Sequence, residues 1–177
     1  MIGPGMIARR SLLAALLIAP GILSGCGWEP LYADRETTAA DADLRAIKVN
    51  PIPERVGQRL EMALRTSFNP TGEETKQRYS LSVVLSTALA SLGVQSQGLG
   101  TRGIVQIYAN YTLREIGTGG PLTTGSIHSA DSFDIQANGY STVVAQDDAL
   151  TRSVEELRRE IVARLILYLQ RKAIPKS

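Results

Sequence analysis

The chain has 177 residues, with 19 Lys and Arg, 17 Asp and Glu, and one His, which gives a formal net charge of +2. Arg9 and Arg10 lie in a segment that we expect to be removed, so the mature chain has 17 basic and 17 acidic residues and no net charge. A neutral domain offers no electrostatic footprint for nucleic acid, which excludes that class of partner. A single His and a single Cys are also too few for a metal cluster.

The first 25 residues have the pattern of an export signal. Arg9 and Arg10 supply positive charge, and the apolar run at residues 11–23 is too short to span a membrane. Leu23-Ser24-Gly25-Cys26 resembles the lipobox of bacterial lipoprotein precursors, in which small residues flank the cleavage site and the Cys thiol is acylated. The alternative is a structural cysteine behind an ordinary cleaved signal. We therefore expect a signal peptide at residues 1–25 and a lipid on Cys26.

The lipid is expected to be the means of membrane attachment, because no second apolar run reaches membrane-spanning length. The lipobox resemblance implies an N-acyl and S-diacylglycerol lipid on Cys26, and we expect no other cofactor. Several acyl chains make release negligible, since each buried methylene contributes about 0.8 kcal/mol. Residues 26–43 mix Pro, Ala, Thr and acids without a period and predict a tether, which leaves residues 44–177 as the folded domain.

The domain is predicted to begin with a strand and a helix. Residues 44–49 alternate apolar and polar side chains, as a half-buried strand does, and Pro51 stops the strand. From Glu54 to Phe68 the apolar residues recur at helical spacing, which predicts an amphipathic helix that Asn69-Pro70 terminates.

Three further strands and a long helix complete the predicted domain. Alternating apolar residues predict strands at 79–86, 105–114 and 127–135, with a turn at 117–121 and a long hairpin tip at 91–101. The last helix has the strongest periodic signal, and Asp147 and Asp148 lie near its predicted start. One face of this helix is apolar: Leu150, Val154, Leu157, Ile161, Leu165 and Leu169. Charged pairs four residues apart lie elsewhere on it: Arg152–Glu156, Glu155–Arg159 and Glu160–Arg164.

These elements predict an α+β fold of two layers, in the order β-α-β-β-β-α. Since each strand has one apolar face, both helices should pack on one face of a four-stranded mixed sheet. The first strand should be parallel to its neighbour, with a right-handed crossover, and the later strands should form an antiparallel meander.

The sheet face that the helices leave uncovered is short of charge. Between Tyr79 and Leu113 the only charged residue is Arg102, and the outward positions carry Ser, Thr, Gln, Asn and Tyr. An ordinary solvent-facing sheet carries Lys and Glu, partly to stop its edges from pairing with other chains. An uncharged polar face is cheap to bury against another polar protein surface, which favours a partner-binding face. The alternative is a Ser- and Thr-rich sheet that simply faces water.

The residues give little support for catalysis. His128 lies close to Ser126, Ser129 and Asp131 on a predicted strand, where neighbouring side chains point to opposite faces, so no nucleophile–base–acid relay is expected. The Gly-rich run at 98–103 does not lead from a strand into a helix and is not a phosphate loop. We expect a protein that is not an enzyme.

Gly25-Cys26-Gly27-Trp28-Glu29-Pro30-Leu31-Tyr32 resembles the start of the LptE-type LPS-assembly lipoproteins, and the order of predicted elements matches as well. The resemblance implies a non-catalytic lipoprotein, anchored in the inner leaflet of the outer membrane on its periplasmic side. Such a protein plugs the lumen of an LptD-type β-barrel translocon, assists its assembly and takes part in inserting lipopolysaccharide into the outer leaflet. An adaptor of another envelope lipid-transport complex is the alternative, and a membrane-tethered hydrolase built on His128 is a third.

Lipopolysaccharide carries phosphates, which Arg and Lys bind. Arg102, near the predicted hairpin tip, is the first candidate for that contact, and it falls roughly where the family has a basic loop residue. Arg152, near the start of the last helix, is the second. For each arginine the alternative is a charge that serves solubility.

Overall fold

The computed structural model describes residues 39–94 and 100–173. The predicted signal peptide, the lipidation of Cys26, the tether up to residue 38 and the middle of the predicted hairpin tip lie outside these residues. Our predictions for those segments therefore stay predictions.

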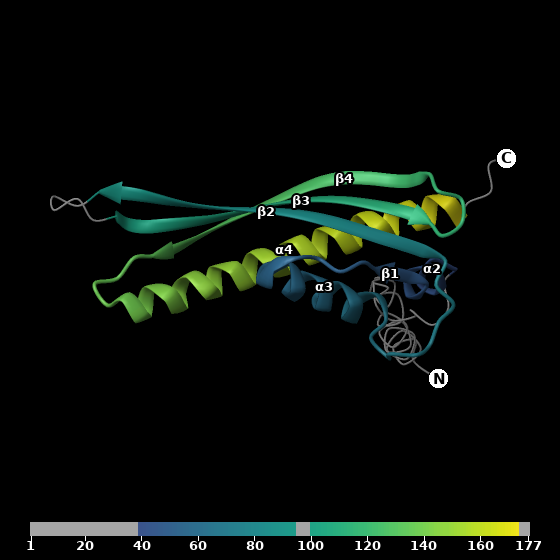
Figure 1. Ribbon diagram of the computed structural model, residues 1–177, viewed down its shortest axis with the longest axis horizontal. Coiled ribbons are helices and arrows are strands. Elements are labelled where there is room, and N and C mark those ends of the chain that lie inside the picture. The colour runs from purple at the N-terminus through teal and green to yellow at the C-terminus, as the bar shows by residue number, and fades with distance from the viewer. Residues whose placement is uncertain (1–38, 95–99, 174–177) are drawn as a thin grey trace, which may run out of the picture. The chain divides into compact units, whose positions relative to one another are not determined.

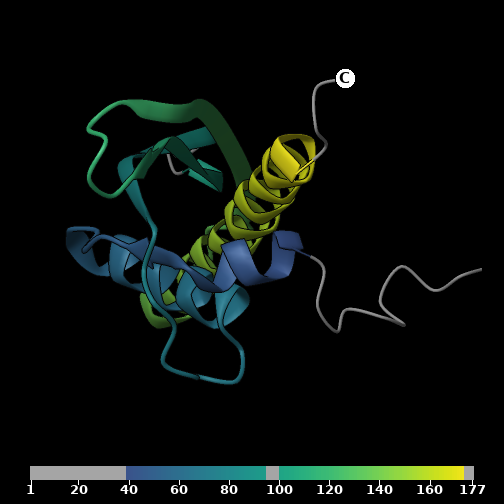
Figure 2. The ribbon, with the colours of Figure 1, turned by 90° about the vertical axis from the view of Figure 1, so that its right-hand side faces the viewer.

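The described chain forms one four-stranded mixed sheet with helices on one of its faces, which confirms the predicted α+β fold (Figures 1 and 2). The strands lie in the order β1-β2-β3-β4, with β1 parallel to β2 and the other pairs antiparallel, as predicted. The elements are α2 (Ala39–Arg45), β1 (Ile47–Val49), α3 (Glu54–Phe68), β2 (Tyr79–Val94), β3 (Gly100–Glu115), β4 (Pro121–Asp134) and α4 (Gly139–Ala173).

The short helix α2 differs from the sequence-based prediction, which placed a tether up to residue 43 and a strand from residue 44. Ala40 and Leu44, one turn apart on this helix, are both buried in the core. Asp41 in its first turn and Arg45 in its last complement the helix dipole. The strand is therefore only Ile47–Val49. The sequence-based prediction missed the helix because an apolar spacing of four over so few residues also fits the alternation of a strand.

The later elements are longer than the sequence predicted. Strands β2 and β3 pair well into the predicted tip, with Leu92 opposite Arg102, because ladder hydrogen bonds form between backbone groups and do not need apolar side chains. Helix α4 begins at Gly139, several residues before the periodic signal. Asn138 explains this start, since its side-chain oxygen accepts a hydrogen bond of 3.0 Å from the backbone N–H of Tyr140.

The core lies between the helices and the sheet face that they cover. Leu60 and Leu64 of α3, and Leu157 and Ile161 of α4, are fully buried there. The residues that the sheet contributes are odd-numbered, because side chains alternate between the two faces. These residues include Leu81, Val83, Val105, Ile107, Leu113, Ile127 and Phe133.

Two glycines on the antiparallel strands make room for aromatic rings. Gly103 lies opposite Phe133 and Gly125 opposite Tyr111 in the pairing of β3 with β4. A Cβ atom on Gly103 would lie 2.2 Å from Cζ of Phe133, and one on Gly125 would lie 2.5 Å from the hydroxyl of Tyr111. Each ring therefore covers the backbone of the opposite strand, which fixes the register of this pair.

We expect Gly103→Ala to destabilise the domain by about 1–3 kcal/mol, because the added methyl group displaces the buried Phe133 ring. Urea denaturation of the purified domain measures the effect. Gly120→Ala is the matched control, since a Cβ there meets no atom within 4 Å. Equal stability of the two variants would contradict the packing role of Gly103.

Candidate partner-binding face

The sheet surface opposite the helices, here called the open face, is uncharged across its middle. Its residues are the even-numbered ones, which strand pairing places in rows that run from β2 through β3 to β4. The following rows contain no Asp, Glu, Lys or Arg: Ser82, Thr112 and Thr124; Val84, Asn110 and Ser126; Ser86, Tyr108 and His128; Ala88, Gln106 and Ala130. This arrangement agrees with the charge-poor face that the sequence predicted.

Exposed apolar and aromatic groups lie among these polar side chains. Val84 is 66% exposed and Tyr108 is 42% exposed. The rings of Tyr108 and His128 lie beside each other, with centroids 5.1 Å apart and a tilt of 30°. A surface of this kind has no charge to desolvate and offers both hydrogen bonds and ring area to a partner.

Charged residues frame the open face at its two ends. Strand pairing places Lys48 and Arg114 in one row with Ser80. At the opposite end, Arg102 of β3 faces Asp134 of β4. The uncharged middle of the open face therefore lies between a row with charged residues at one end of the strands and a row with charged residues at the other.

His128 lies on the open face, while Ser129 lies on the face that the helices cover. His128 is exposed and Ser129 is 2% exposed, where its hydroxyl donates a hydrogen bond of 2.6 Å to Glu156. Asp131 also lies on the covered side, where it accepts a hydrogen bond from Ser153. The structure therefore keeps His128 apart from Ser129 and Asp131, and this separation is the one that strand alternation predicted.

Arg102, the first candidate for phosphate binding, lies on β3 at the charged end of the open face. Its Nε lies 3.6 Å from a carboxylate oxygen of Asp134, and both side chains are more than half exposed. An exposed pair at this distance contributes little to stability. The guanidinium can therefore exchange Asp134 for a phosphate at small cost.

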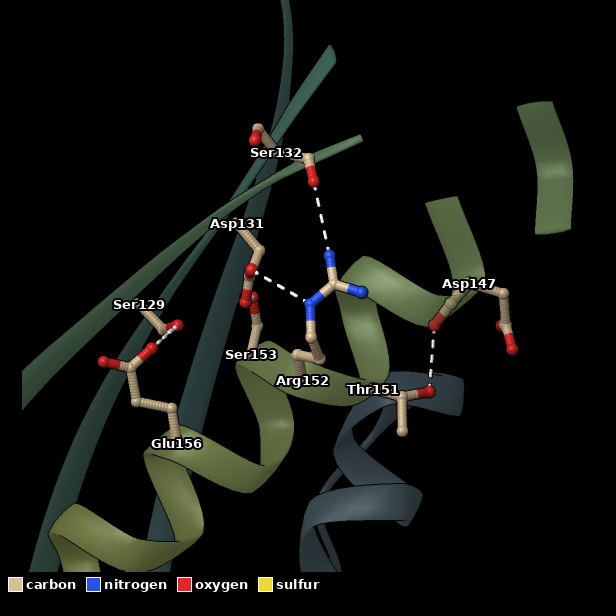
Figure 3. A network of polar contacts seen from close by, with 8 residues as sticks. All are labelled: Ser129, Asp131, Ser132, Asp147, Thr151, Arg152, Ser153 and Glu156. Carbon is tan, nitrogen blue, oxygen red and sulfur yellow. Dashed lines mark hydrogen bonds and ion pairs between the residues drawn. The ribbon is translucent and has the colours of Figure 1, made fainter. Parts of the chain in front are cut away.

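Arg152, the second candidate, belongs to a network between β4 and α4 (Figure 3). Its Nε donates to Asp131 at 3.2 Å, and its Nη2 donates to the backbone carbonyl of Ser132 at 3.3 Å. The fully buried hydroxyl of Ser153 donates to the other oxygen of Asp131. Arg152 thus lies on the helix side of the sheet and Arg102 lies on the open face, so the two arginines do not form one site.

A second polar cluster holds α2 and α4 to the start of β2. The hydroxyl of Tyr79 accepts hydrogen bonds from Arg78 at 3.0 Å and Lys172 at 3.3 Å, and Arg78 pairs with Asp43 at 2.7 Å. Burial lowers the pKa of Lys172, but its hydrogen bond to Tyr79 and the neighbouring acidic groups together raise that pKa above its usual value. These ionic contacts are structural and lie away from the middle of the open face.

A hollow of about 850 Å³ lies beside β1 and the loop after α3. Its lining includes Arg45, Lys48 and Arg65 as well as Glu73 and Glu74. Arg45 and Glu73 already pair with each other at 3.4 Å. Because small-molecule sites are mostly apolar with a few convergent polar groups, this mixed-charge hollow is a poor candidate for one.

The described residues hold neither a membrane-spanning helix nor a cluster of metal ligands. None of the helices within residues 39–173 is both long and apolar enough to cross a membrane. No group of three or more His, Cys, Asp and Glu residues in the same part of the chain is arranged to hold a metal ion.

Sequence reasoning missed the acidic partners of both arginines and the pairing of Tyr108 with His128. The spacing of four on α4 suggested Glu156 as the partner of Arg152, but Glu156 instead accepts a hydrogen bond from Ser129. These contacts depend on the register between strands, and between β4 and α4, which residue spacing within one element does not contain.

No family model and no curated protein matches the sequence. Among solved structures, a proposed lipoprotein from Caulobacter crescentus is similar, with a TM-score of 0.63 and 17% identity over 78% of this chain and 100% of that chain. A minor lipoprotein from Acinetobacter baumannii gives a TM-score of 0.50 and 13% identity over 68% and 90% of the two chains. The rare lipoprotein B from Shewanella oneidensis gives a TM-score of 0.47 and 8% identity over 71% of this chain and 94% of that chain. The chain thus shares its α+β fold with the first two of these lipoprotein structures.

Proposed function

We propose that this protein is an outer-membrane lipoprotein that plugs an LptD-type β-barrel, assists the assembly of that barrel and takes part in lipopolysaccharide transport through it. The uncharged open face carries this proposal, because it is a surface suited to burial against a polar wall. The resemblance of the segment around Cys26 to LptE-type lipoproteins, and the fold shared with structures described as lipoproteins, support it.

The physical match is between the uncharged open face and a polar barrel wall. The interior of a large membrane barrel is polar and lined with water. Hydroxyl and amide groups such as those of Ser86, Gln106 and Asn110 can exchange hydrogen bonds with water for hydrogen bonds with such a wall. Lys or Glu at the same positions would lose hydration without a fixed partner.

Arg102 is our candidate for contact with the phosphates of lipopolysaccharide. It lies at the end of β3 that leads into the hairpin tip, and its only described ion pair, with Asp134, is long and exposed. Arg152 is the weaker candidate, because Asp131 and the carbonyl of Ser132 already occupy its guanidinium.

We expect Gln106→Lys, in the middle of the open face, to lower recovery of the barrel with the lipidated chain at least about tenfold, since an unpaired buried charge costs several kcal/mol. Affinity purification from detergent-solubilised outer membranes measures this recovery, and the barrel is identified by its change of gel mobility on heating. Gln58→Lys, on the exposed surface of α3, is the matched control.

Unchanged recovery with Gln106→Lys would show that the open face is not the contact. Recovery of an inner-membrane ATPase complex in place of a barrel would favour the lipid-transport adaptor. Cys26→Ala is a second control, which should leave an unprocessed precursor in the inner membrane if that cysteine is the acylation site.

We expect Arg102→Glu to weaken binding of purified lipopolysaccharide by about tenfold, because it replaces attraction to phosphate by repulsion. Recovery of the barrel should be unchanged, which separates lipid binding from assembly. Arg55→Glu, on the exposed side of α3, controls for the change in net charge. Equal loss with both variants would mean that net charge, and not Arg102, governs binding.

A further inference from the structure

The outer edge of β2 has no described partner beyond its first residues. Strand β1 pairs only with Tyr79–Leu81. The backbone N–H of Asn50 then donates to the carbonyl of Leu81 at 2.9 Å, and the chain turns away at Pro51, which has no N–H to continue the ladder. Within the described residues, the edge of β2 from Val83 onward is thus left without a neighbouring strand.

The groups exposed at this edge follow from the contact with Asn50. Because the carbonyl of Leu81 points toward β1, and alternate residues of a strand point their backbone groups the same way, the odd-numbered residues direct N–H and C=O outward. By the same alternation, the even-numbered residues of β2 direct their backbone N–H and C=O groups toward β3. The outward set is Val83, Leu85, Thr87, Leu89 and Ser91.

Among the described residues, nothing at this edge keeps an exposed strand from pairing. Natural edges carry charges, proline or bulges, or are covered by other elements. The segment Val83–Ser91 contains no charged residue and no proline, and its pairing with β3 is continuous. It is about 30 Å long at 3.3–3.4 Å per residue, and Leu89 along it is 59% exposed.

The opposite edge of the sheet, on β4, is protected by arginines from α4. Arg164 donates to the outward carbonyl of Ser126 at 3.1 Å, and Arg152 donates to that of Ser132 at 3.3 Å. Asp134 adds a charge at the end of the strand. The arginines therefore occupy backbone carbonyls at the β4 edge, whereas no described residue pairs with the edge of β2 from Val83 onward.

We propose that the edge of β2 from Val83 to Ser91 is a strand-addition site, which binds an extended segment of the barrel partner. This inference rests on the proposed function. The expected segment has polar uncharged residues on the open-face side and apolar residues at alternate positions on the helix side, where they cover Leu85 and Leu89. It lies outside the closed barrel wall, whose strands have no free backbone groups.

The open face favours the segment of the barrel partner over a second copy of the chain as the added strand. A two-fold dimer centred on Thr87 would pair the outward backbone groups of β2, with Leu85 opposite Leu89 of the other copy. It would leave both open faces exposed. A stable interface buries about 1,600 Å², which is more than one strand edge offers. A partner that meets the edge and the adjoining open face together buries both uncharged surfaces.

We expect Thr87→Pro to lower recovery of the barrel with the lipidated chain about tenfold, because proline removes an outward N–H and blocks an added strand. The domain should still fold, since the N–H of Thr87 does not bond to β3, and circular dichroism of the purified domain checks this. Thr87→Ala, which keeps the N–H, is the matched control. Leu89→Lys is a second variant, which places a charge on the same edge without changing the backbone.

The outcomes separate the edge from the proposed function. Loss of the barrel with Thr87→Pro and Leu89→Lys, but not with Thr87→Ala, supports strand addition. If the wild-type chain recovers the barrel and both edge variants recover it equally well, the edge inference is wrong and the proposed function stands. If the wild-type chain recovers no barrel, the proposed function itself fails.

A cysteine at position 87 tests the second copy directly. The two-fold arrangement would bring two such cysteines together, so Thr87→Cys would give a disulfide-linked homodimer in the membrane. Formation of that homodimer would overturn the proposed occupant. A cross-link from the same cysteine to the barrel would support it.

Discussion

The alternation of side chains along β2, β3 and β4 is the constraint on which the rest of the structure depends. Odd-numbered residues of these strands, such as Leu81, Ile107 and Ile127, enter the core under the helices, and the even-numbered residues between them form the open face. A slip of one residue would exchange the two sets and place Ser and Gln in the core. The pairs Gly103–Phe133 and Gly125–Tyr111 oppose such a slip, because each ring fits only where the opposite residue has no side chain.

The ionic groups of the domain lie around this uncharged surface and not within it. Arg102 and Asp134 lie at one end of the open face, and Arg152 and Arg164 bind carbonyls along the outer edge of β4. The middle of the open face and the edge of β2 are left uncharged side by side. A domain whose sheet face and sheet edge contacted only solvent would carry charged residues on both surfaces.

Periodicity in the sequence predicted most of the fold. It gave the bounds of α3, the mixed sheet and the face that the helices cover, because each of these follows from alternation or helical spacing within one segment. It missed α2, whose Ala40 and Leu44 supply too short a pattern, and the first turns of α4, whose start depends on the cap by Asn138.

The candidate site was only partly predictable from the sequence. Its lack of charge is a property of composition and was visible in the sequence. The contact of Tyr108 with His128, the pairing of Arg102 with Asp134 and the lack of a described neighbour for most of the β2 edge depend on which residues lie opposite each other. Strand register is set by contacts between segments far apart in the chain, so spacing within one segment does not predict it.

The central claim is that the open face is buried against a partner in the membrane. Labelling of a Ser86→Cys chain with a membrane-impermeant maleimide tests it, with Gln58→Cys on α3 as reference and each rate normalised to that of the purified domain. In intact outer membranes we expect the cysteine at position 86 to react at least about tenfold more slowly relative to the reference, since burial excludes the reagent. Equal normalised rates at the two positions would contradict the account.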